Sequence, residues 1–239
     1  MNSAFRCVAL ASLCLALPGA FLDASAQVPQ PPPSQISFHF ERPGMEVPEY
    51  TFILHEDGTG TYEASVPDRA AKQNAVRYGQ PSGPPPVTRI ALSYTLPAAL
   101  TQTLFAEIRG ARLNSGCASK QKNVANTGMK TLTYAGPEAS TQCSFNYTQN
   151  KSVTALAETF QAMSFTLSAG RALAYDERFD RLSLDHEMNA LVAAAKDGSA
   201  QGVSLIAPEL QSLIDNVQVM ERVRRNASVL LDKAVPAPQ

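Results

Sequence analysis

The spacing of hydrophobic residues changes once along the chain, near residue 150, and this change constrains the fold more than any other feature. Before it, short segments alternate apolar and polar residues, as strands with one buried face do. After it, apolar residues recur every three or four positions, as on amphipathic helices. The sequence therefore predicts an α+β fold: a small, mainly antiparallel sheet with one packed helix, followed by a C-terminal helical region.

Six segments of the first half have the composition of short strands, and one has helical spacing between them. Apolar residues at 100, 104 and 108 predict the helix, which we expect to pack against the sheet. The expected strands are Ile36–Phe40, Tyr50–Leu54, Thr59–Ser65, Arg89–Leu96, Thr131–Tyr134 and Cys143–Tyr147.

The dipeptide Asp57-Gly58 separates the second and third expected strands. It is typical of a tight hairpin, either a type I′ turn or a type I turn with a glycine bulge. The surrounding stretch, HEDGTGTYEAS, also contains a His and several acids. A calcium loop needs further acidic ligands after the glycine, however, and an aspartic protease needs Asp-Thr-Gly. We therefore interpret Asp57 and Gly58 as a turn.

The N-terminus has the three parts of a secretory signal peptide. A short start with one Arg precedes the apolar run Cys7–Leu17, and Ala24-Ser25-Ala26 provides small residues for cleavage. The run of eleven residues is shorter than the roughly 20 that span a bilayer. We expect residues 1–26 to be removed, with no transmembrane anchor left, and the protein to be exported to the periplasm or the extracellular space.

The remaining chain divides into four expected parts. Residues 27–35 are a proline-rich spacer, 36–150 the α+β domain, 151–234 the C-terminal helical region and 235–239 a tail. We expect the first C-terminal helix to end at Gly170. The charged segment Tyr175–Leu182 is then a solvated linker, and Asp215 with Gln218 resembles a capping box for the last helix.

Cysteine usage supports the same compartment. Cys7 and Cys14 leave with the signal peptide, so the mature chain keeps Cys117 and Cys143. Two cysteines in an exported protein predict one disulfide. A metal site or a catalytic thiol is the weaker alternative, because neither residue lies beside a His or in a Cys-x-x-Cys pair.

The motifs of common enzymes are missing from the sequence, and we predict no catalytic residue, no metal site and no cofactor. His186-Glu187 begins like the zinc-protease motif, but Ala190 stands where the second His belongs. The chain has no Gly-x-Ser-x-Gly motif and no phosphate-binding glycine loop. A net charge of −1 also disfavours a nucleic-acid partner.

Two small groups of basic residues are candidates for an interaction with a partner. Arg222, Arg224 and Arg225 form a cluster in the last expected helix, which could also dock on the charged segment Tyr175–Leu182. Lys120, Lys122 and Lys130 lie between the two cysteines and could meet an anionic partner, or could belong to an ordinary polar loop.

The segment from Pro48-Glu-Tyr50 to Asp57-Gly-Thr-Gly-Thr-Tyr62 resembles small uncharacterised domains of bacterial exported proteins and lipoproteins. The shared features are a Pro-x-Tyr strand, an Asp-Gly hairpin and a return strand with a Tyr. The resemblance covers about residues 36–147. It implies an α+β unit and a bacterial exported protein, and it implies no particular activity.

From these observations we expect a non-catalytic binding protein, or an interaction protein associated with the envelope. Its partner would be another envelope or secreted protein. The alternatives are a hydrolase without a recognisable motif, and an inhibitor-like module that uses the long proline-rich loop at residues 67–88.

Export can be tested directly. If the signal peptide is cleaved after Ala26, N-terminal sequencing of the exported protein will begin at Gln27. A soluble cytoplasmic product that retains Met1 would contradict this prediction.

Overall fold

The computed structural model describes residues 33–68, 86–111, 113, 117, 119, 124–137 and 139–234. The expected signal peptide, most of the spacer and the C-terminal tail lie outside these residues. So do residues 69–85 of the long loop and the candidate interaction residues Lys120 and Lys122.

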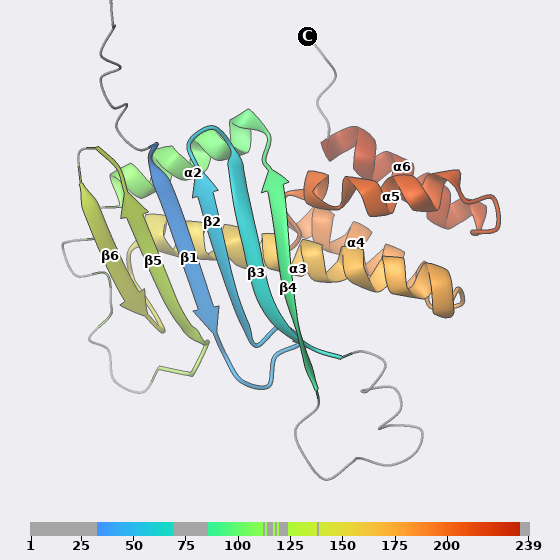
Figure 1. Ribbon diagram of the computed structural model, residues 1–239, viewed down its shortest axis with the longest axis horizontal. Helices are drawn as coiled ribbons and strands as arrows, with labels where there is room; N and C mark the ends of the chain where they lie inside the picture. The colour runs from blue at the N-terminus through green and yellow to red at the C-terminus, as the bar shows by residue number, and fades with distance from the viewer. Residues whose placement is uncertain are drawn as a thin grey trace, which may run out of the picture. The chain divides into compact units, whose positions relative to one another are not determined.

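Six strands form one antiparallel sheet in the order β4-β3-β2-β1-β5-β6. The sheet and its accompanying helices confirm the predicted α+β class with a C-terminal helical region (Figure 1). The strands are β1 (Gln35–Glu41), β2 (Glu49–His55), β3 (Thr59–Pro67), β4 (Val87–Thr95), β5 (Met129–Ala135) and β6 (Ser140–Phe145). The helices are α2 (Ala98–Gly110), α3 (Lys151–Phe179), α4 (Leu184–Asp197), η2 (Val203–Ile206), α5 (Ala207–Asp215) and α6 (Glu221–Ala234).

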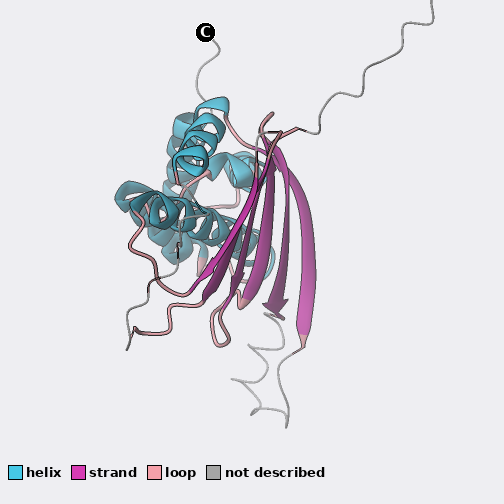
Figure 2. Cartoon of the chain, turned by 90° about the vertical axis from the view of Figure 1, so that its left-hand side faces the viewer, coloured by secondary structure: helices cyan, strands magenta, loops and turns pink. Residues whose placement is uncertain are grey.

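The helices cover only one face of the sheet, which Figure 2 shows from the side. The alternation in the sequence therefore has a direct structural meaning. On β1, Ile36, Phe38 and Phe40 are buried toward the helices, while Ser37 and His39 lie on the open face. Strand side chains alternate between faces, so each strand supplies one apolar row to the core.

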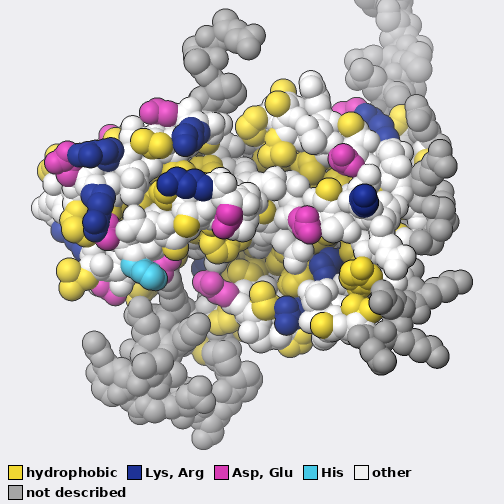
Figure 3. Space-filling view, turned by 180° about the vertical axis from the view of Figure 1, so that it is seen from behind, with side chains coloured by type: hydrophobic (Ala, Val, Ile, Leu, Met, Phe, Trp, Pro, Cys, Tyr) yellow, Lys and Arg dark blue, Asp and Glu magenta, His cyan; other side chains and the backbone are white. Residues whose placement is uncertain are grey.

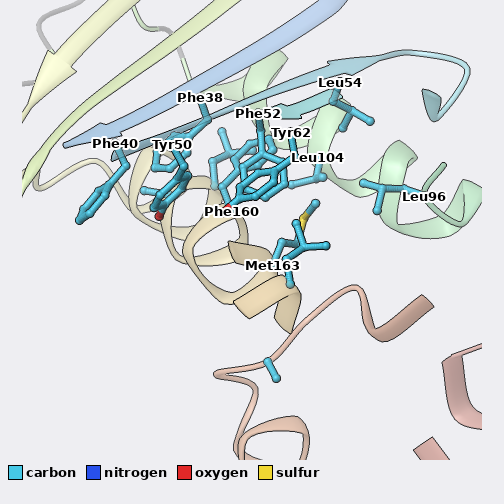
Figure 4. Close-up of a cluster of buried hydrophobic side chains, with 14 of the residues drawn as sticks. Phe38, Phe40, Tyr50, Phe52, Leu54, Tyr62, Leu96, Leu104, Phe160 and Met163 are labelled. Atoms are coloured by element: carbon cyan, nitrogen blue, oxygen red, sulfur yellow. The ribbon is translucent and has the colours of Figure 1, made fainter. Parts of the chain in front are cut away.

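Aromatic side chains attach α3 to the centre of the sheet (Figure 4). The ring of Phe160 stacks on Phe38 with centroids 5.1 Å apart and planes 10° apart, and it lies 5.5 Å from Phe52. One turn later, Ser164 Oγ and Tyr62 Oη share a buried hydrogen bond of 3.1 Å. Burial raises the pKa of Tyr62 above its usual range, and this hydrogen bond opposes the shift.

The C-terminal helices extend the same core. Helices α4, α5 and η2 pack against α3, and α6 packs against α4 and α5. One continuous cluster of buried apolar residues runs from Ile36 to Leu230, and the described residues form one compact unit. The helical region is thus packed on the sheet through α3. Within the described residues, no helix has both the length and the hydrophobicity needed to span a membrane.

Gly170 does not end a helix, as predicted, but lies in the middle of the 29-residue α3. A Cβ at this position would lie 2.4 Å from Cγ2 of Ile206, so the glycine permits close packing of η2. Because α3 continues to Phe179, most of the predicted linker at Tyr175–Leu182 is helical.

The predicted capping box at Asp215 and Gln218 is also wrong. Asp215 ends α5, and α6 begins only at Glu221. The turn between them is organised by Asn216, whose Oδ1 accepts from the backbone N–H of Gln218 at 3.0 Å. This short-range bond occupies the amide that the capping box would need.

The two cysteines of the mature chain lie together, in agreement with the predicted disulfide. Cys117 and Cys143 are paired, with Cα atoms 6.1 Å apart, which is within the range for disulfides. The bond joins β6 to the segment that follows α2.

The Asp57-Gly58 turn has the geometry of a type I turn with a glycine bulge. The N–H of Gly58 donates to the carbonyl of His55 at 3.0 Å, and Gly58 has a φ of +87°. Oδ1 of Asp57 accepts from the backbone N–H and the hydroxyl of Thr59, at 2.8 and 2.7 Å. These bonds lower the pKa of the Asp57 carboxyl below its usual range.

Substitutions in this turn should separate the effect of backbone geometry on stability from the effect of the Asp57 charge. We predict that Gly58→Val lowers the free energy of unfolding by at least about 1 kcal/mol, because a β-branched residue is strained at positive φ. Its Cβ would also lie 3.0 Å from the carbonyl oxygen of Leu96. Asp57→Asn should leave stability nearly unchanged, because Asn keeps the accepting oxygen.

Thermal melts of both variants, with calcium and with a chelator, check this prediction. A calcium-dependent melting temperature that disappears in Asp57→Asn would show that the turn is an ion site instead.

Candidate functional site

The His residues and acids of the described chain do not converge on one point. No group of three or more His, Cys, Asp or Glu among the described residues could hold a metal ion. His39 lies on β1 and is hydrogen-bonded through Nδ1 to Thr51 Oγ1 at 2.9 Å. His55 ends β2, and His186 is exposed on α4.

The predicted arginine cluster on α6 is divided among different neighbours. Arg222 pairs with Asp185 of α4, and Arg225 pairs with Glu221 of its own helix at 2.7 Å. Nε of Arg224 is buried, with no acceptor among the described residues. Basic and acidic side chains are interspersed over the helical region in Figure 3. Of the three arginines, Arg222 alone joins α6 to another helix of the described chain, and it docks on α4 instead of on Tyr175–Leu182.

Lys130, which lies between the two cysteines in the sequence, is buried and stabilises the fold. Its Nζ donates to the carbonyl oxygens of Thr127, Gly128 and Asn146 at 3.3, 3.1 and 3.2 Å, and to Thr127 Oγ1 at 3.1 Å. The rings of Phe40 and Phe145 lie within 6 Å. Burial lowers the pKa of Lys130, and nearby Arg42 adds to this effect. The ammonium thus closes a loop and is not available to a ligand.

Lys130 borders a recess of about 610 Å³ between the end of β6 and the start of α3. A second polar side chain that borders this recess, that of Asn146, is also used in hydrogen bonds within the fold. Asn146 accepts from the backbone N–H of Thr127 at 2.8 Å and donates to the carbonyl of Ala125 at 3.0 Å. Although Asn146-Tyr-Thr matches a glycosylation acceptor, its side-chain amide is occupied by the neighbouring loop.

A second recess, which we call the α3 groove, has polar groups that the fold does not use. It has a volume of about 350 Å³ and lies between the end of β3, the second half of α3 and the start of α5. Ser168, Arg171, Tyr175 and Arg178 line it from α3 at helical spacing, and Glu46 and Glu209 border it from the β1–β2 loop and α5.

Two charged groups of the α3 groove have free hydrogen-bonding capacity. Arg178 is exposed and makes no ion pair or hydrogen bond within the described residues. Oε2 of Glu209 is buried, and no donor of the described chain reaches it. By contrast, Glu46 accepts from Ser168 Oγ at 3.2 Å. The groove therefore presents an exposed donor, Arg178, and has at its border a buried acceptor oxygen that the described residues leave unpaired.

Aromatic surface continues the α3 groove toward the end of the helix. The rings of Tyr175 and Phe179 are 4.9 Å apart, and Phe179 is 71% exposed. Exposed aromatic and arginine side chains are enriched at protein–protein contacts.

Reasoning from the sequence missed this groove. It ends the helix at Gly170, which leaves Arg171 outside any predicted element and places Tyr175 and Arg178 in a linker, so the three do not share one helical face. The signal that could have identified them is the spacing of positions 168, 171, 175 and 178, which places all four on one side of a continuous helix.

Comparison with known proteins found no matching family model, no similar curated protein and no similar solved structure.

The structural role of Lys130 can be tested by removing its charge. We predict that Lys130→Met lowers the free energy of unfolding by about 2–4 kcal/mol, because buried carbonyl groups lose their donor. The neighbouring Lys151 is exposed, so Lys151→Met should change stability by less than about 0.5 kcal/mol. Denaturant titration of both variants makes the comparison, and equal effects would contradict the buried role of Lys130.

Proposed function

We propose that this protein is an exported, non-catalytic binding protein that receives a segment of another envelope or secreted protein in the α3 groove. The observation that carries the proposal is the pair of unused charged groups in this groove, Arg178 on α3 and Glu209 on α5. A polypeptide matches such a surface because its backbone and side chains supply both acceptors and donors.

The dimensions of the α3 groove favour a chain segment as its occupant. From Ser168 to Arg178 the helix advances about 15 Å, the length of four or five extended residues. The recess is bordered by β3 on one side and α5 on the other. An exposed Arg178 can pair with an acidic side chain or a carbonyl of the partner.

The compartment is part of the same proposal. A signal peptide at residues 1–26 and a single pair of cysteines in the mature chain both fit an oxidising location outside the cytoplasm. The resemblance to bacterial exported domains supports a periplasmic or extracellular site of action.

The groove can be tested with matched arginine substitutions. The mature protein, residues 27–239, is immobilised and exposed to the envelope fraction of the expressing cell, in wild-type form and as Arg178→Glu and Arg225→Glu variants. Both arginines are exposed, but only Arg178 lines the groove. We expect Arg178→Glu to weaken capture of the partner by about tenfold or more, and Arg225→Glu to leave it unchanged.

Tyr175→Ala serves as a second groove variant, because it removes contact area without a change of charge. Capture that is insensitive to both groove variants, or that depends equally on Arg225, would refute the proposed site.

A further inference from the structure

We infer that the partner segment binds as an extended peptide that pairs with β4 and becomes a seventh strand of the sheet. This inference rests on the proposed function and specifies the conformation of the partner and the way in which it is held.

Within the described residues, five positions on the outer edge of β4 have backbone groups without a partner. At one end of β4 the N–H of Leu96 donates to the carbonyl of Gly58, and at the other end the carbonyl of Pro86 accepts from Asp68. Backbone groups of successive strand residues point to alternate sides. Even-numbered residues therefore face β3, and the N–H and C=O groups of the odd-numbered ones face outward. These are Val87, Arg89, Ala91, Ser93 and Thr95.

Nothing among the described residues covers this edge. No backbone hydrogen bond other than those to β3 reaches β4, and all nine of its side chains are exposed or half-buried. Val87 is 56% exposed and Leu92 is 39% exposed. Long edge strands with one charge and no internal proline are templates for pairing with another strand.

The opposite edge of the sheet has a neighbouring segment. Cys143 of β6 is joined to Cys117, and the N–H of Ser119 donates to the carbonyl of Tyr147 just beyond this strand. Within the described residues, β4 has no such neighbour.

The helix layer continues past β4, so an added strand could pack on it (Figure 1). The 29 residues of α3 span about 43 Å. Six strands at their usual spacing of about 4.8 Å span about 24 Å. Phe160 lies under β1 and β2, and Ser164 lies under β3. The residues that follow, from Ser168 onward, line the α3 groove.

An added strand would use β4 and the α3 groove together. Its backbone would bond to the five outward residues of β4. Alternate side chains would point toward the helix layer beside Ile90 and Leu92, the residues of β4 that face this side. Apolar side chains fit there, and an acidic one can reach Arg178. The only charge on β4 itself is Arg89, which also favours a neutral or acidic peptide.

The helix layer that extends beyond β4 also prevents a second copy of this chain from pairing along the full length of β4. In such a pairing, Ala91 would oppose Ala91 of the other copy. Helix α3 crosses the sheet close to this point, because Tyr62, which bonds to Ser164, is paired with Leu92. The protruding halves of the two α3 helices would then occupy the same space. A single peptide strand has no helix layer and meets no such clash.

Hydrogen exchange tests the inference with the unmodified mature protein. The probe is a peptide selected on this protein from a phage-displayed library of random twelve-residue sequences. In the free protein, amides of Arg89, Ala91 and Ser93 should exchange fast and those of Ile90, Leu92 and Tyr94 slowly. Bound peptide should slow the first three by about tenfold or more. Failure to select any peptide, or binding without this protection, overturns the inference.

Two substitutions at one position supply the matched control. Ala91→Pro removes an outward N–H without breaking a bond to β3, so edge strands tolerate it. It should weaken peptide binding by about tenfold or more, measured by fluorescence anisotropy. Ala91→Lys keeps the N–H and directs its side chain to the open face, so binding should persist. Equal binding by both variants would count against strand addition.

These outcomes are separate from those of the groove test. If Arg178→Glu weakens capture of the envelope partner but Ala91→Pro does not, the proposed function stands and strand addition is wrong. A concentration-dependent dimer of the wild type that Ala91→Pro abolishes would identify β4 as a contact between copies and would also overturn the inference.

Discussion

The contact of Phe160 with Phe38 and Phe52 fixes the position of α3, and the rest of the structure depends on that position. All three rings are fully buried. Stacked and tilted aromatic pairs contribute stability beyond the area that they bury. Because this contact lies near the start of a long helix, the second half of α3 extends beyond the sheet, where α4 and α5 pack against it.

The two edge strands of the sheet, β6 and β4, have different surroundings. At the β6 edge, a disulfide, the enclosed ammonium of Lys130 and the bonds of Asn146 stabilise the surrounding loops. At the β4 edge, the described residues leave both the backbone groups and the adjoining α3 groove unoccupied. This asymmetry connects the two proposals, since the free backbone groups and the free charges of Arg178 and Glu209 lie on the same side of the molecule.

Much of the fold could be predicted from local patterns. Local patterns placed an expected strand within or across each of the six strands, although the last was expected at Cys143–Tyr147 and lies at Ser140–Phe145. Asp57-Gly58 identified the hairpin, because a tight reversal needs a residue with positive φ. Gly170 was misinterpreted because a glycine that ends a helix and one that admits a neighbouring side chain look the same in sequence. Only the contact with Ile206 distinguishes them. That single error concealed the helical face of Arg171, Tyr175 and Arg178, and with it the candidate site.

The sequence by itself determined the class of the fold, its strands and most of its helices, because these follow from hydrophobic periodicity and turn chemistry within short windows. Tertiary structure decided which polar groups are used by the fold and which are free. Lys130 and Arg178 are both basic residues with polar neighbours in the sequence. In the fold, carbonyl groups enclose the ammonium of Lys130, whereas Arg178 faces the α3 groove. That difference arises from residues distant in the chain, such as Asn146 for Lys130 and Glu209 for Arg178, which only folding brings near.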